Sequence, residues 1–271
     1  MKLSATVVTY QPDIAVLQRS IASLAGAVAR ARETGLASSA VLYVVDNGPG
    51  DALGPIAQAA KEFAAAGTLE ILHGHGNVGY GRANNLVLPR LDSGVHLVMN
   101  PDVELDRDSL VAAIEALRDD DRVGAVAPAV RGPLGERQYL CKRYPSVWVL
   151  FLRGFAPAFV RAWFAAALDR YEMRDLPNDL PTAPVPLASG CFMLMRTPLF
   201  KRVGGFDPRF FMYFEDYDLS LRIGREAQVA YVPQARIVHH GGEASRKGLK
   251  HVAWFMRSAW RFFAIHGWKI A

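Results

Sequence analysis

Short apolar runs alternate with stretches of helical spacing along the first 131 residues. The runs LSATVVTY, AVLYVVDN, TLEILHG, HLVMNPDVEL and VGAVAPAV are rich in β-branched residues and have the length of buried strands. Between the first two runs, apolar residues recur at helical spacing up to Gly35: Ile14, Leu17, Ile21, Leu24 and Val28. Further helices are predicted over about 53–66 and 107–119. This alternation predicts an α/β fold, a Rossmann-like, mostly parallel central sheet with helices on both faces.

The rest of the chain departs from that alternation. Residues of about 132–185 combine many prolines with apolar and basic pieces, which predicts an irregular, partly helical excursion over the mouth of the site. The chain then returns through the strand ASGCFMLMR, an acidic stretch, the strands QVAYVP and ARIVHHGG, and a final helix. A length of 271 residues with 51% hydrophobic residues fits one elaborated domain.

Polar residues follow two of the predicted strands. Asp46 and Asn47 end the second, and Asn100 and Asp102, two apart on an extended segment, end the fourth. Ligands of open α/β sheets bind at the carboxyl ends of strands, and a carboxylate there suits a divalent cation that also holds phosphate. Taken alone, each of these residues is more typical of a turn or a helix N-cap than of a binding site.

A glycine-rich loop, GNVGYGRANN, leads into a short helix. Gly76, Gly79 and Gly81 allow close approach of the backbone, and a helix N-terminus attracts anions. The GxxGxG spacing after the third strand excludes a dinucleotide-binding fingerprint. The alternative is a flexible loop before a packed helix, but the polar residues of the first turn favour a binding role: Arg82, Asn84 and Asn85.

Three carboxylates follow an apolar, aromatic stretch in the segment FEDYDLSLR. If a helix begins near Glu215, Asp218 pairs with Arg222 at i,i+4, whereas Asp216 has no such partner. An apolar surrounding raises the pKa of a carboxyl group, so Asp216 is a candidate general base. The alternative is that Glu215 and Asp216 cap the helix. The predicted wall consists of Phe211, Tyr213 and Phe214.

The dipeptide His239–His240 ends a late predicted strand. Successive strand residues face opposite sides, so one imidazole at most faces the site, where it could complete a coordination shell begun by a carboxylate. The alternative for each is a surface or core histidine with no ligand role.

Charge and cysteine content narrow the cellular setting. The net charge of +5 suits an anionic small molecule, an anionic membrane or nucleic acid, but the basic residues are scattered outside the tail, which disfavours nucleic acid. The two cysteines form no disulfide framework or CxxC pair, and no apolar run reaches about 18 residues. We therefore expect a cytoplasmic protein.

The segment 249–271 is predicted to be an amphipathic helix. One stripe is basic with indoles: Lys250, Trp254, Arg257, Arg261 and Trp268. The opposite stripe is apolar and could pack on the domain: Val252, Phe255, Met256, Ala259 and Phe263. The basic stripe suits a peripheral position on the anionic inner face of the cytoplasmic membrane, and the alternative is a solvated basic face.

In this order, the segments TY, VDN, GNVGYGRANN, NPD, GCFMLMR, GGFDPRFFMYFEDYDLSLR and HHGG resemble an inverting family 2 glycosyltransferase of the GT-A fold. More narrowly, they resemble the rhamnosyltransferase-like bacterial members that build O-antigen and related cell-surface polysaccharides. The resemblance covers nearly the whole chain. It implies metal-dependent transfer of a sugar, with dTDP-L-rhamnose the favoured donor, to a glycan acceptor that is lipid-linked.

The resemblance also implies roles for individual residues. Asp216 would be the catalytic base with Glu215 beside it, and Gly190, Phe211, Tyr213 and Phe214 would form the acceptor side. Mg²⁺ or Mn²⁺ would be held by Asp102 and His239, because Asn100 replaces the first aspartate of the DxD motif. The implied nucleotide-sugar residues are Thr9, Tyr10, Asp46, Asn77, Gly79, Gly81, Arg82, Asn84, Asn85, Asn100 and Asp102.

On this interpretation the domain has four parts: a nucleotide-sugar half (1–131), the excursion (132–185), an acceptor and catalytic half (186–248) and the C-terminal helix (249–271). Three alternatives are open. A transferase for another dTDP- or UDP-sugar would carry the same motifs. A sugar-nucleotide nucleotidyltransferase should have a glycine-rich basic loop after the first strand, which TYQPD lacks. A catalytically silent binding module fits poorly with intact Glu215, Asp216 and Asp102.

Overall fold

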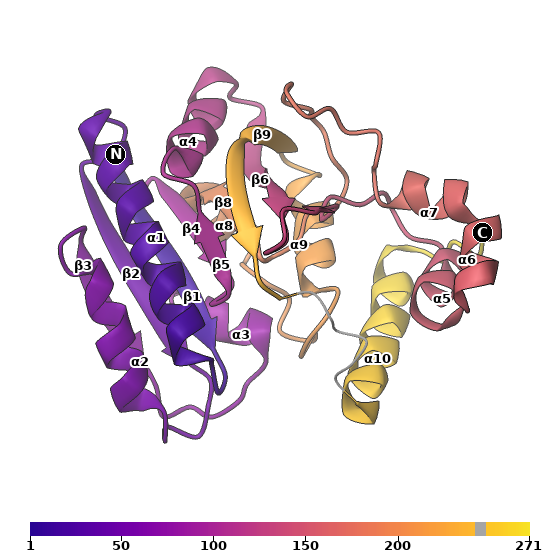
Figure 1. The fold of residues 1–271 in the computed structure, drawn as a ribbon, viewed down its shortest axis with the longest axis horizontal. Coiled ribbons are helices and arrows are strands. Elements are labelled where there is room, and N and C mark those ends of the chain that lie inside the picture. The colour runs from indigo at the N-terminus through magenta and orange to yellow at the C-terminus, as the bar shows by residue number, and fades with distance from the viewer. Residues whose placement is uncertain (242–247) are drawn as a thin grey trace.

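Buried strands rich in β-branched residues form the centre of the structure (Figure 1). The structure is a computed structural model that describes residues 1–241 and 248–271. Within these residues one nine-stranded sheet has the order β3-β2-β1-β4-β8-β6-β9-β5, with β7 paired to β6. The strands are β1 (Lys2–Thr9), β2 (Ser39–Asp46), β3 (Thr68–Leu72), β4 (Val95–Met99), β5 (Val103–Leu105), β6 (Val123–Arg131), β7 (Arg137–Gln138), β8 (Phe192–Arg196) and β9 (Gln228–His239).

The N-terminal part of the sheet is parallel. β1 pairs with β2 and β4, and β2 pairs with β3, all in the same direction. β8 lies antiparallel between β4 and β6, and β6 runs parallel to β9. The predicted mostly parallel α/β sheet is therefore confirmed, and the carboxyl ends of β1, β2 and β4 lie at one edge.

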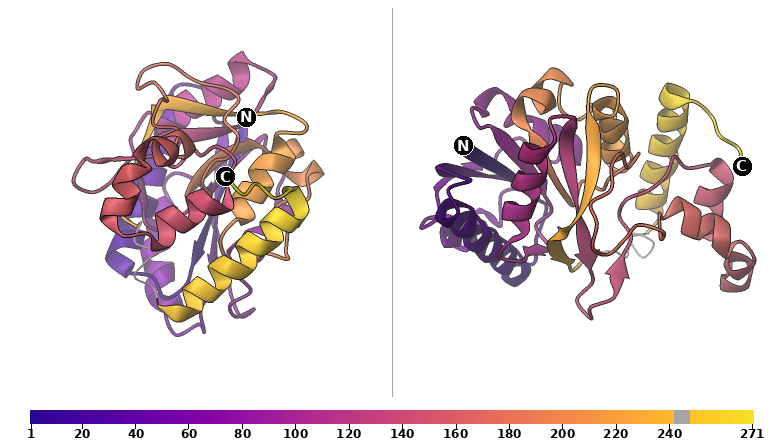
Figure 2. Two further views of the ribbon diagram at one scale, coloured as in Figure 1. Left: turned by 90° about the vertical axis from the view of Figure 1, so that its right-hand side faces the viewer. Right: turned by 90° about the horizontal axis from the view of Figure 1, so that it is seen from above.

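Helices cover both faces of the sheet, as predicted (Figures 1 and 2). The first face packs against α1 (Ile14–Glu33), α2 (Leu53–Ala60) and α4 (Ser109–Asp119). The second packs against α3 (Tyr80–Asn85), α8 (Thr197–Arg202) and α9 (Glu215–Ile223). Neighbouring strand residues divide between the two cores, since Val44 belongs to the first and Val45 to the second.

The excursion is partly helical, and it lies with the C-terminal helix at one end of the molecule (Figure 1). It contains α5 (Val147–Phe155), α6 (Ala158–Trp163) and α7 (Ala165–Tyr171), and the C-terminal helix is α10 (Leu249–His266). A third apolar cluster joins these helices to the chain around α9: Leu150, Tyr171, Phe210, Phe214, Ala259, Phe262 and Phe263. No described helix is both long enough and apolar enough to cross a bilayer.

Three predicted elements differ in the structure. HLVMNPDVEL is not one strand, because a turn at Asn100–Asp102 separates β4 from β5, which pairs antiparallel with β9. The prediction that Asn100 and Asp102 lie on one extended segment is therefore wrong; Pro101 has no amide hydrogen for a strand ladder. The two late strands are one, β9, and the α-helix predicted over 53–66 ends at Ala60 and continues as a 3₁₀ turn (Lys61–Phe63).

The predicted faces of the C-terminal helix are also partly wrong. Phe255, Ala259 and Phe263 pack inward as predicted, but Val252 and Met256 of the same stripe are exposed. On the basic stripe, the ring of Trp254 lies 5.0 Å from that of Phe211, Arg261 donates to the carbonyl of Arg209, and Trp268 lies beyond the end of α10. Contacts with the loop before α9 rotate the buried face away from the one that hydrophobic periodicity alone predicts.

A buried polar network fixes α10 to α9. The predicted pair is confirmed: Arg222 Nε donates to Asp218 Oδ2 at 2.8 Å. His266, at the end of α10, lies with Nε2 2.8 Å from the other oxygen of Asp218. The Asp218 side chain is only 1% exposed, so both partners are needed to compensate its desolvation.

We predict that Asp218→Ala lowers the free energy of unfolding by about 3–5 kcal/mol, because it leaves Arg222 and His266 without their buried partner. Urea unfolding followed by circular dichroism measures this loss. Asp92→Ala removes an exposed partner of Lys2 and serves as the control, with an expected cost below about 1 kcal/mol. Equal losses in the two variants would contradict a structural role for the network.

Candidate functional site

Asp46 lies at the carboxyl edge of the parallel strands, and one of its carboxylate oxygens has no hydrogen-bond partner among the described residues. Its Oδ1 accepts from the amide of Gly48 at 3.0 Å and from the hydroxyl of Thr9 at 3.4 Å. Its Oδ2 is buried and has no hydrogen-bond partner among the described residues. Thr9 is buried, whereas Tyr10 is exposed beside it. Because buried polar atoms are nearly always hydrogen-bonded, Asp46 Oδ2 is suited to accept from a bound ligand.

The glycine-rich loop is held by asparagine side chains. Asn47 donates to Asn77 Oδ1 at 3.1 Å and accepts from the amide of Val78, while Asn77 Oδ1 also accepts from the amide of Gly79. Gly79 has a positive φ of 90°, and a Cβ there would lie 2.4 Å from the carbonyl oxygen of Phe211. Glycine is therefore required where the loop touches the segment before α9.

Helix α3 makes its polar contacts with that same segment. Asn85 donates to the carbonyl of Phe206 at 2.7 Å and accepts from its amide at 2.9 Å, and Arg82 Nε donates to the carbonyl of Pro208. Asn84 is fully buried and its Oδ1 has no described partner. All three polar residues predicted here hold the protein's own backbone, since Asn84 Nδ2 donates to the carbonyl of Tyr80 at 3.1 Å, and Asn84 also keeps an unused acceptor in Oδ1.

Asp102 and His239 face one another across β5 and β9. His239 Nε2 lies 3.6 Å from Asp102 Oδ1, which is buried and has no hydrogen-bond partner in the described ranges. The side-chain amide nitrogen of Gln138 donates to the His239 carbonyl. The side-chain oxygen of Gln138, 3.0 Å from His239 Nδ1, therefore accepts a hydrogen bond from the Nδ1–H of the ring. In the neutral imidazole the lone pair then lies on Nε2, the nitrogen on the Asp102 side.

The second histidine of the pair points elsewhere. His240 Nε2 lies 2.8 Å from Glu104, so adjacent residues of β9 face opposite sides. The residues in 1–241 and 248–271 include no group of three or more His, Cys, Asp or Glu arranged to hold a metal ion. Asp102 and His239 thus fit a divalent cation that takes its remaining ligands from water or phosphate oxygens.

A strained turn places two carboxylates at the start of α9. Tyr213 and Phe214 both adopt left-handed backbone conformations, with φ of 69° and 65°, directly before Glu215. Asp216 Oδ2 accepts from the amide of Gly190 at 3.0 Å, and its Oδ1 accepts from the amide of Tyr217. Glu215 is 7% exposed, and its Oε2 has no partner among described atoms.

The carboxyl groups of Glu215 and Asp216 differ in the surroundings that shift their pKa values. Burial, reinforced by the adjacent Asp216, raises the pKa of Glu215 to about 8. Burial also raises the pKa of Asp216, but its backbone hydrogen bonds from Gly190 and Tyr217 oppose the shift. At neutral pH Glu215 therefore retains its proton, whereas the two backbone hydrogen bonds favour the ionised form of Asp216.

A cavity of about 150 Å³ lies against these carboxylates. Tyr213 and Phe214 line it, as predicted for the wall around the carboxylates, but Phe211 packs on Trp254. A Cβ at Gly190 would lie 3.4 Å from Asp216 Cβ and from Tyr80, so that space is already bordered by protein. The cavity wall also contains residues that were not predicted from the sequence: Leu150, Arg153, Tyr171, Tyr217 and Phe255.

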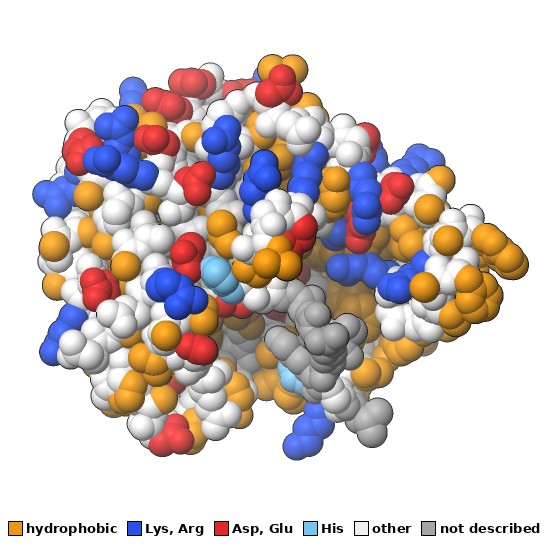
Figure 3. All heavy atoms as spheres, viewed as in Figure 1, with side chains coloured by type: hydrophobic (Ala, Val, Ile, Leu, Met, Phe, Trp, Pro, Cys, Tyr) orange, Lys and Arg blue, Asp and Glu red, His pale blue; other side chains and the backbone are white. Residues whose placement is uncertain are grey.

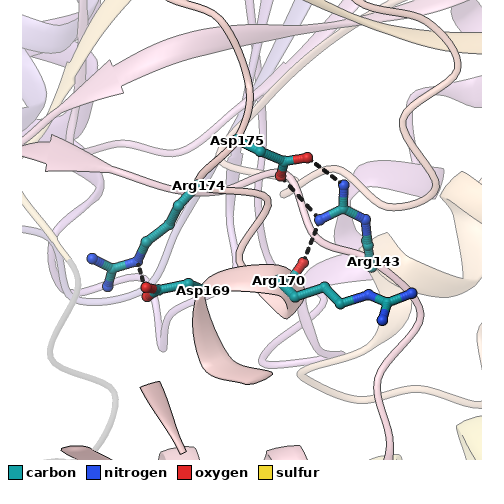
Figure 4. A pocket seen from close by; sticks show the side chains of 5 residues that line it. All are labelled: Arg143, Asp169, Arg170, Arg174 and Asp175. Atoms are coloured by element: carbon teal, nitrogen blue, oxygen red, sulfur yellow. Dashed lines mark hydrogen bonds and ion pairs between the residues drawn. The ribbon is translucent and has the colours of Figure 1, made fainter. Parts of the chain in front are cut away.

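Three of these missed residues come from the 132–185 excursion, whose irregular sequence carries no motif that points to a site. A second hollow in the excursion, shown in Figure 4, has charges that largely pair within it. There Arg143 binds both oxygens of Asp175, and Arg174 lies 3.0 Å from Asp169. We therefore interpret that hollow as a structural feature of the excursion, held by these ion pairs, and not as part of the candidate site.

The sequence is similar to a known protein family and to individual members of it. The model of glycosyl transferase family 2 matches residues 4–204. The chain is 31% identical to an N-acetylglucosaminyl-diphospho-decaprenol L-rhamnosyltransferase of Mycobacterium tuberculosis, over 97% of this chain and 84% of that protein. It is 26% identical to the rhamnosyltransferase WbbL of Escherichia coli K12, over 70% of this chain and 71% of that one.

Solved structures support the fold. GalNAc-T7 with UDP, GalNAc and Mn²⁺ matches 92% of this chain with a TM-score of 0.66 and 14% identity. A mannosyltransferase of Pyrobaculum calidifontis with GDP-Man and Mn²⁺ matches 95% with a TM-score of 0.60 and 18% identity. The alignments span 44% and 60% of those two chains. At these identities the likeness concerns the fold, which is GT-A-like, as the sequence resemblance implied.

The raised pKa of Glu215 makes stability depend on pH. An acid with a higher pKa in the folded than in the unfolded protein binds more protons when folded, so the free energy of unfolding falls as pH rises between the two values. For Glu215 this interval runs from its ordinary 4.5 to about 8. We predict that Glu215→Gln, which cannot ionise, flattens this decline by a few kcal/mol, on the order of 1.4 per pKa unit.

Urea unfolding at a series of pH values measures the difference. Glu115→Gln, at an exposed position of α4, is the matched control and should follow the unmodified protein. A Glu215→Gln curve parallel to that of the unmodified protein would show that Glu215 ionises normally.

Proposed function

We propose that this chain, which belongs to glycosyl transferase family 2 and moves a sugar from a nucleotide donor, transfers L-rhamnose from dTDP-L-rhamnose. The proposed acceptor is a lipid-linked glycan of a cell-surface polysaccharide such as O-antigen. The rhamnose assignment is supported by the names of the relatives in Mycobacterium tuberculosis and Escherichia coli. The acceptor class is supported by the first of these names, which specifies a diphospho-decaprenol acceptor for that enzyme.

The donor would bind along the carboxyl edge of β1, β2 and β4. Asp46 Oδ2 and Asn84 Oδ1 are buried acceptors without described partners, and they would accept from the nucleoside and the sugar. Thr9 would hold Asp46 in place, Tyr10 would stack at the exposed rim, and the loop through Asn77, Gly79 and Gly81 would enclose the nucleotide. Arg82 and Asn85 would shape this site indirectly, through the backbone of 206–208.

Asp102 and His239 would hold Mg²⁺ or Mn²⁺, the latter named with two structural neighbours. When bound, the cation would neutralise charge on the departing nucleoside diphosphate. Asn100 would act on the donor from the turn between β4 and β5. The orphan oxygen of Asp102 supports this assignment because a buried carboxylate without partners is costly.

Asp216 would act as the general base. Its carboxylate would take the proton of an acceptor hydroxyl, and that oxygen would attack the anomeric carbon from the side opposite the leaving group, which inverts the configuration. Neutral Glu215 would donate a hydrogen bond to the acceptor through its unpartnered side. Tyr213 and Phe214 would pack against the acceptor in the cavity. The observation that carries the proposal is the pair of carboxyl groups, Glu215 buried and Asp216 half-buried, beside this cavity.

We predict that Asp216→Asn lowers kcat for rhamnosyl transfer by at least about 10²–10⁴-fold, because the amide cannot accept the proton. Donor affinity should stay within about twofold, since Asp216 lies on the acceptor side. Steady-state kinetics and calorimetric titration with dTDP measure the two quantities separately. Full activity of the variant would exclude Asp216 as the base, and a matching loss of dTDP binding would assign it to the donor site.

Calorimetric titration with dTDP, UDP and GDP, each with and without Mn²⁺, tests the donor and the cation together. We expect dTDP to bind most tightly and Mn²⁺ to strengthen its binding. Asp102→Asn should remove most of the Mn²⁺ effect, whereas Glu104→Gln, in the adjacent strand β5 but facing His240, should retain it. Preference for UDP or GDP would replace the rhamnose donor, and an unchanged Mn²⁺ effect in Asp102→Asn would exclude Asp102 as a ligand.

A further inference from the structure

The helices α5 and α6 present a row of aromatic rings to solvent. Phe159 and Trp163 of α6 are 63% and 80% exposed, and three rings of α5 are each at least 40% exposed. We call these five residues the aromatic face: Trp148, Phe151, Phe155, Phe159 and Trp163. In Figure 3, hydrophobic side chains gather at the end of the molecule where Figure 1 shows α5 and α6.

The aromatic face is continuous within each helix. Ring centroids of Trp148 and Phe151 are 5.6 Å apart, those of Phe151 and Phe155 are 6.0 Å apart, and those of Phe159 and Trp163 are 6.2 Å apart. On α5 the spacing i, i+3, i+7 puts the rings on one side, while Leu150 and Leu152 are buried on another. A row of this size in water marks an interaction surface.

The charges nearby favour a lipid surface as the partner. From 147 to 171 the chain has three arginines, Arg153, Arg161 and Arg170, and one acid, Asp169, a net charge of +2. Exposed aromatic rings combined with cations on short helices suit the interface of an anionic bilayer. Because no described helix could cross a bilayer, such helices would lie on its surface.

The aromatic face also adjoins the candidate site. Leu150 and Arg153 of α5 line the cavity that contains Asp216, so one helix borders both the cavity and the exposed rings. We propose that the aromatic face docks this protein on the surface of an anionic membrane, next to the cavity that receives the acceptor. The inference rests on the proposed lipid-linked acceptor, whose hydrocarbon chain would stay in the bilayer while its sugar enters the cavity.

This surface differs from the stripe of α10 that the sequence predicted for a membrane. Part of that stripe is engaged by the protein itself, through Trp254 on Phe211 and Arg261 on the carbonyl of Arg209. The exposed apolar residues near the start of α10, Val252 and Met256, therefore provide a matched control on a second helix.

Flotation with vesicles tests the docking surface. The unmodified protein should bind vesicles of phosphatidylcholine mixed with phosphatidylglycerol more strongly than vesicles of phosphatidylcholine alone. The double variant Phe159→Ser/Trp163→Ser should lower the partition coefficient by about tenfold or more, because it removes two interfacial rings. Val252→Ser/Met256→Ser should stay within about twofold of the unmodified protein, and Arg161→Glu should weaken the preference for anionic lipid.

Three results would overturn the proposal. The unmodified protein could fail to bind the anionic vesicles, or the aromatic double variant could bind them as well as the unmodified protein does. Alternatively, light scattering could show a dimer that the double variant converts to a monomer, which would make the aromatic face a contact between two copies of the chain.

Failure of the docking surface can be distinguished from failure of the proposed function. Both substituted side chains of α6 are exposed, and neither lines the cavity, so titration of the double variant with dTDP should be unchanged. Loss of vesicle binding with intact nucleotide binding supports the docking surface alone. Intact vesicle binding without binding of any nucleotide would refute the donor assignment and leave the surface standing.

Discussion

The backbone of Gly190 joins the parts of the site on which the chemistry depends. Its amide donates to Asp216 at the start of α9, and its carbonyl accepts from the hydroxyl of Tyr80 in α3 at 2.8 Å. A single residue, two positions before β8, thus connects α3 to α9, the helix that carries the proposed base. Because Asp216 is buried, the amide of Gly190 also supplies part of the compensation that lets the carboxylate ionise there.

Three carboxylates that are neighbours in sequence have three different environments. Asp218 is neutralised by Arg222 and His266 and anchors α10. Glu215 has a buried oxygen without a described partner and a raised pKa, so it retains its proton. Asp216 lies between these extremes, with two backbone donors and no cation. Burial and these differences in hydrogen bonding thus give Glu215 and Asp216 different protonation behaviour, although the two residues are adjacent in the chain.

Three buried oxygens near the proposed donor site have hydrogen-bonding capacity that the described residues do not use. Asp46 Oδ2, Asn84 Oδ1 and Asp102 Oδ1 are all buried and have no hydrogen-bond partners among the described residues. Asp46 ends β2 and Asp102 lies just beyond β4, at the edge where open α/β sheets bind ligands, and Asn84 lies in α3, directly after the glycine-rich loop. Such atoms reduce stability in the absence of a ligand, and that reduction is recovered when a ligand supplies the missing bonds.

Local patterns in the sequence were enough to determine the alternating strands and helices of the first half, the family and the pairing of Asp218 with Arg222, because each depends on residues close together in the chain. Strand alternation indicated that one of His239 and His240 at most faces the site, and the family resemblance pointed to His239. The tertiary structure decided the break at Asn100–Asp102, the use of Asn85 for the backbone of Phe206, the buried face of α10 and the contribution of Leu150, Arg153 and Tyr171 to the cavity. These features depend on contacts between segments far apart in sequence, whose packing geometry no local periodicity encodes.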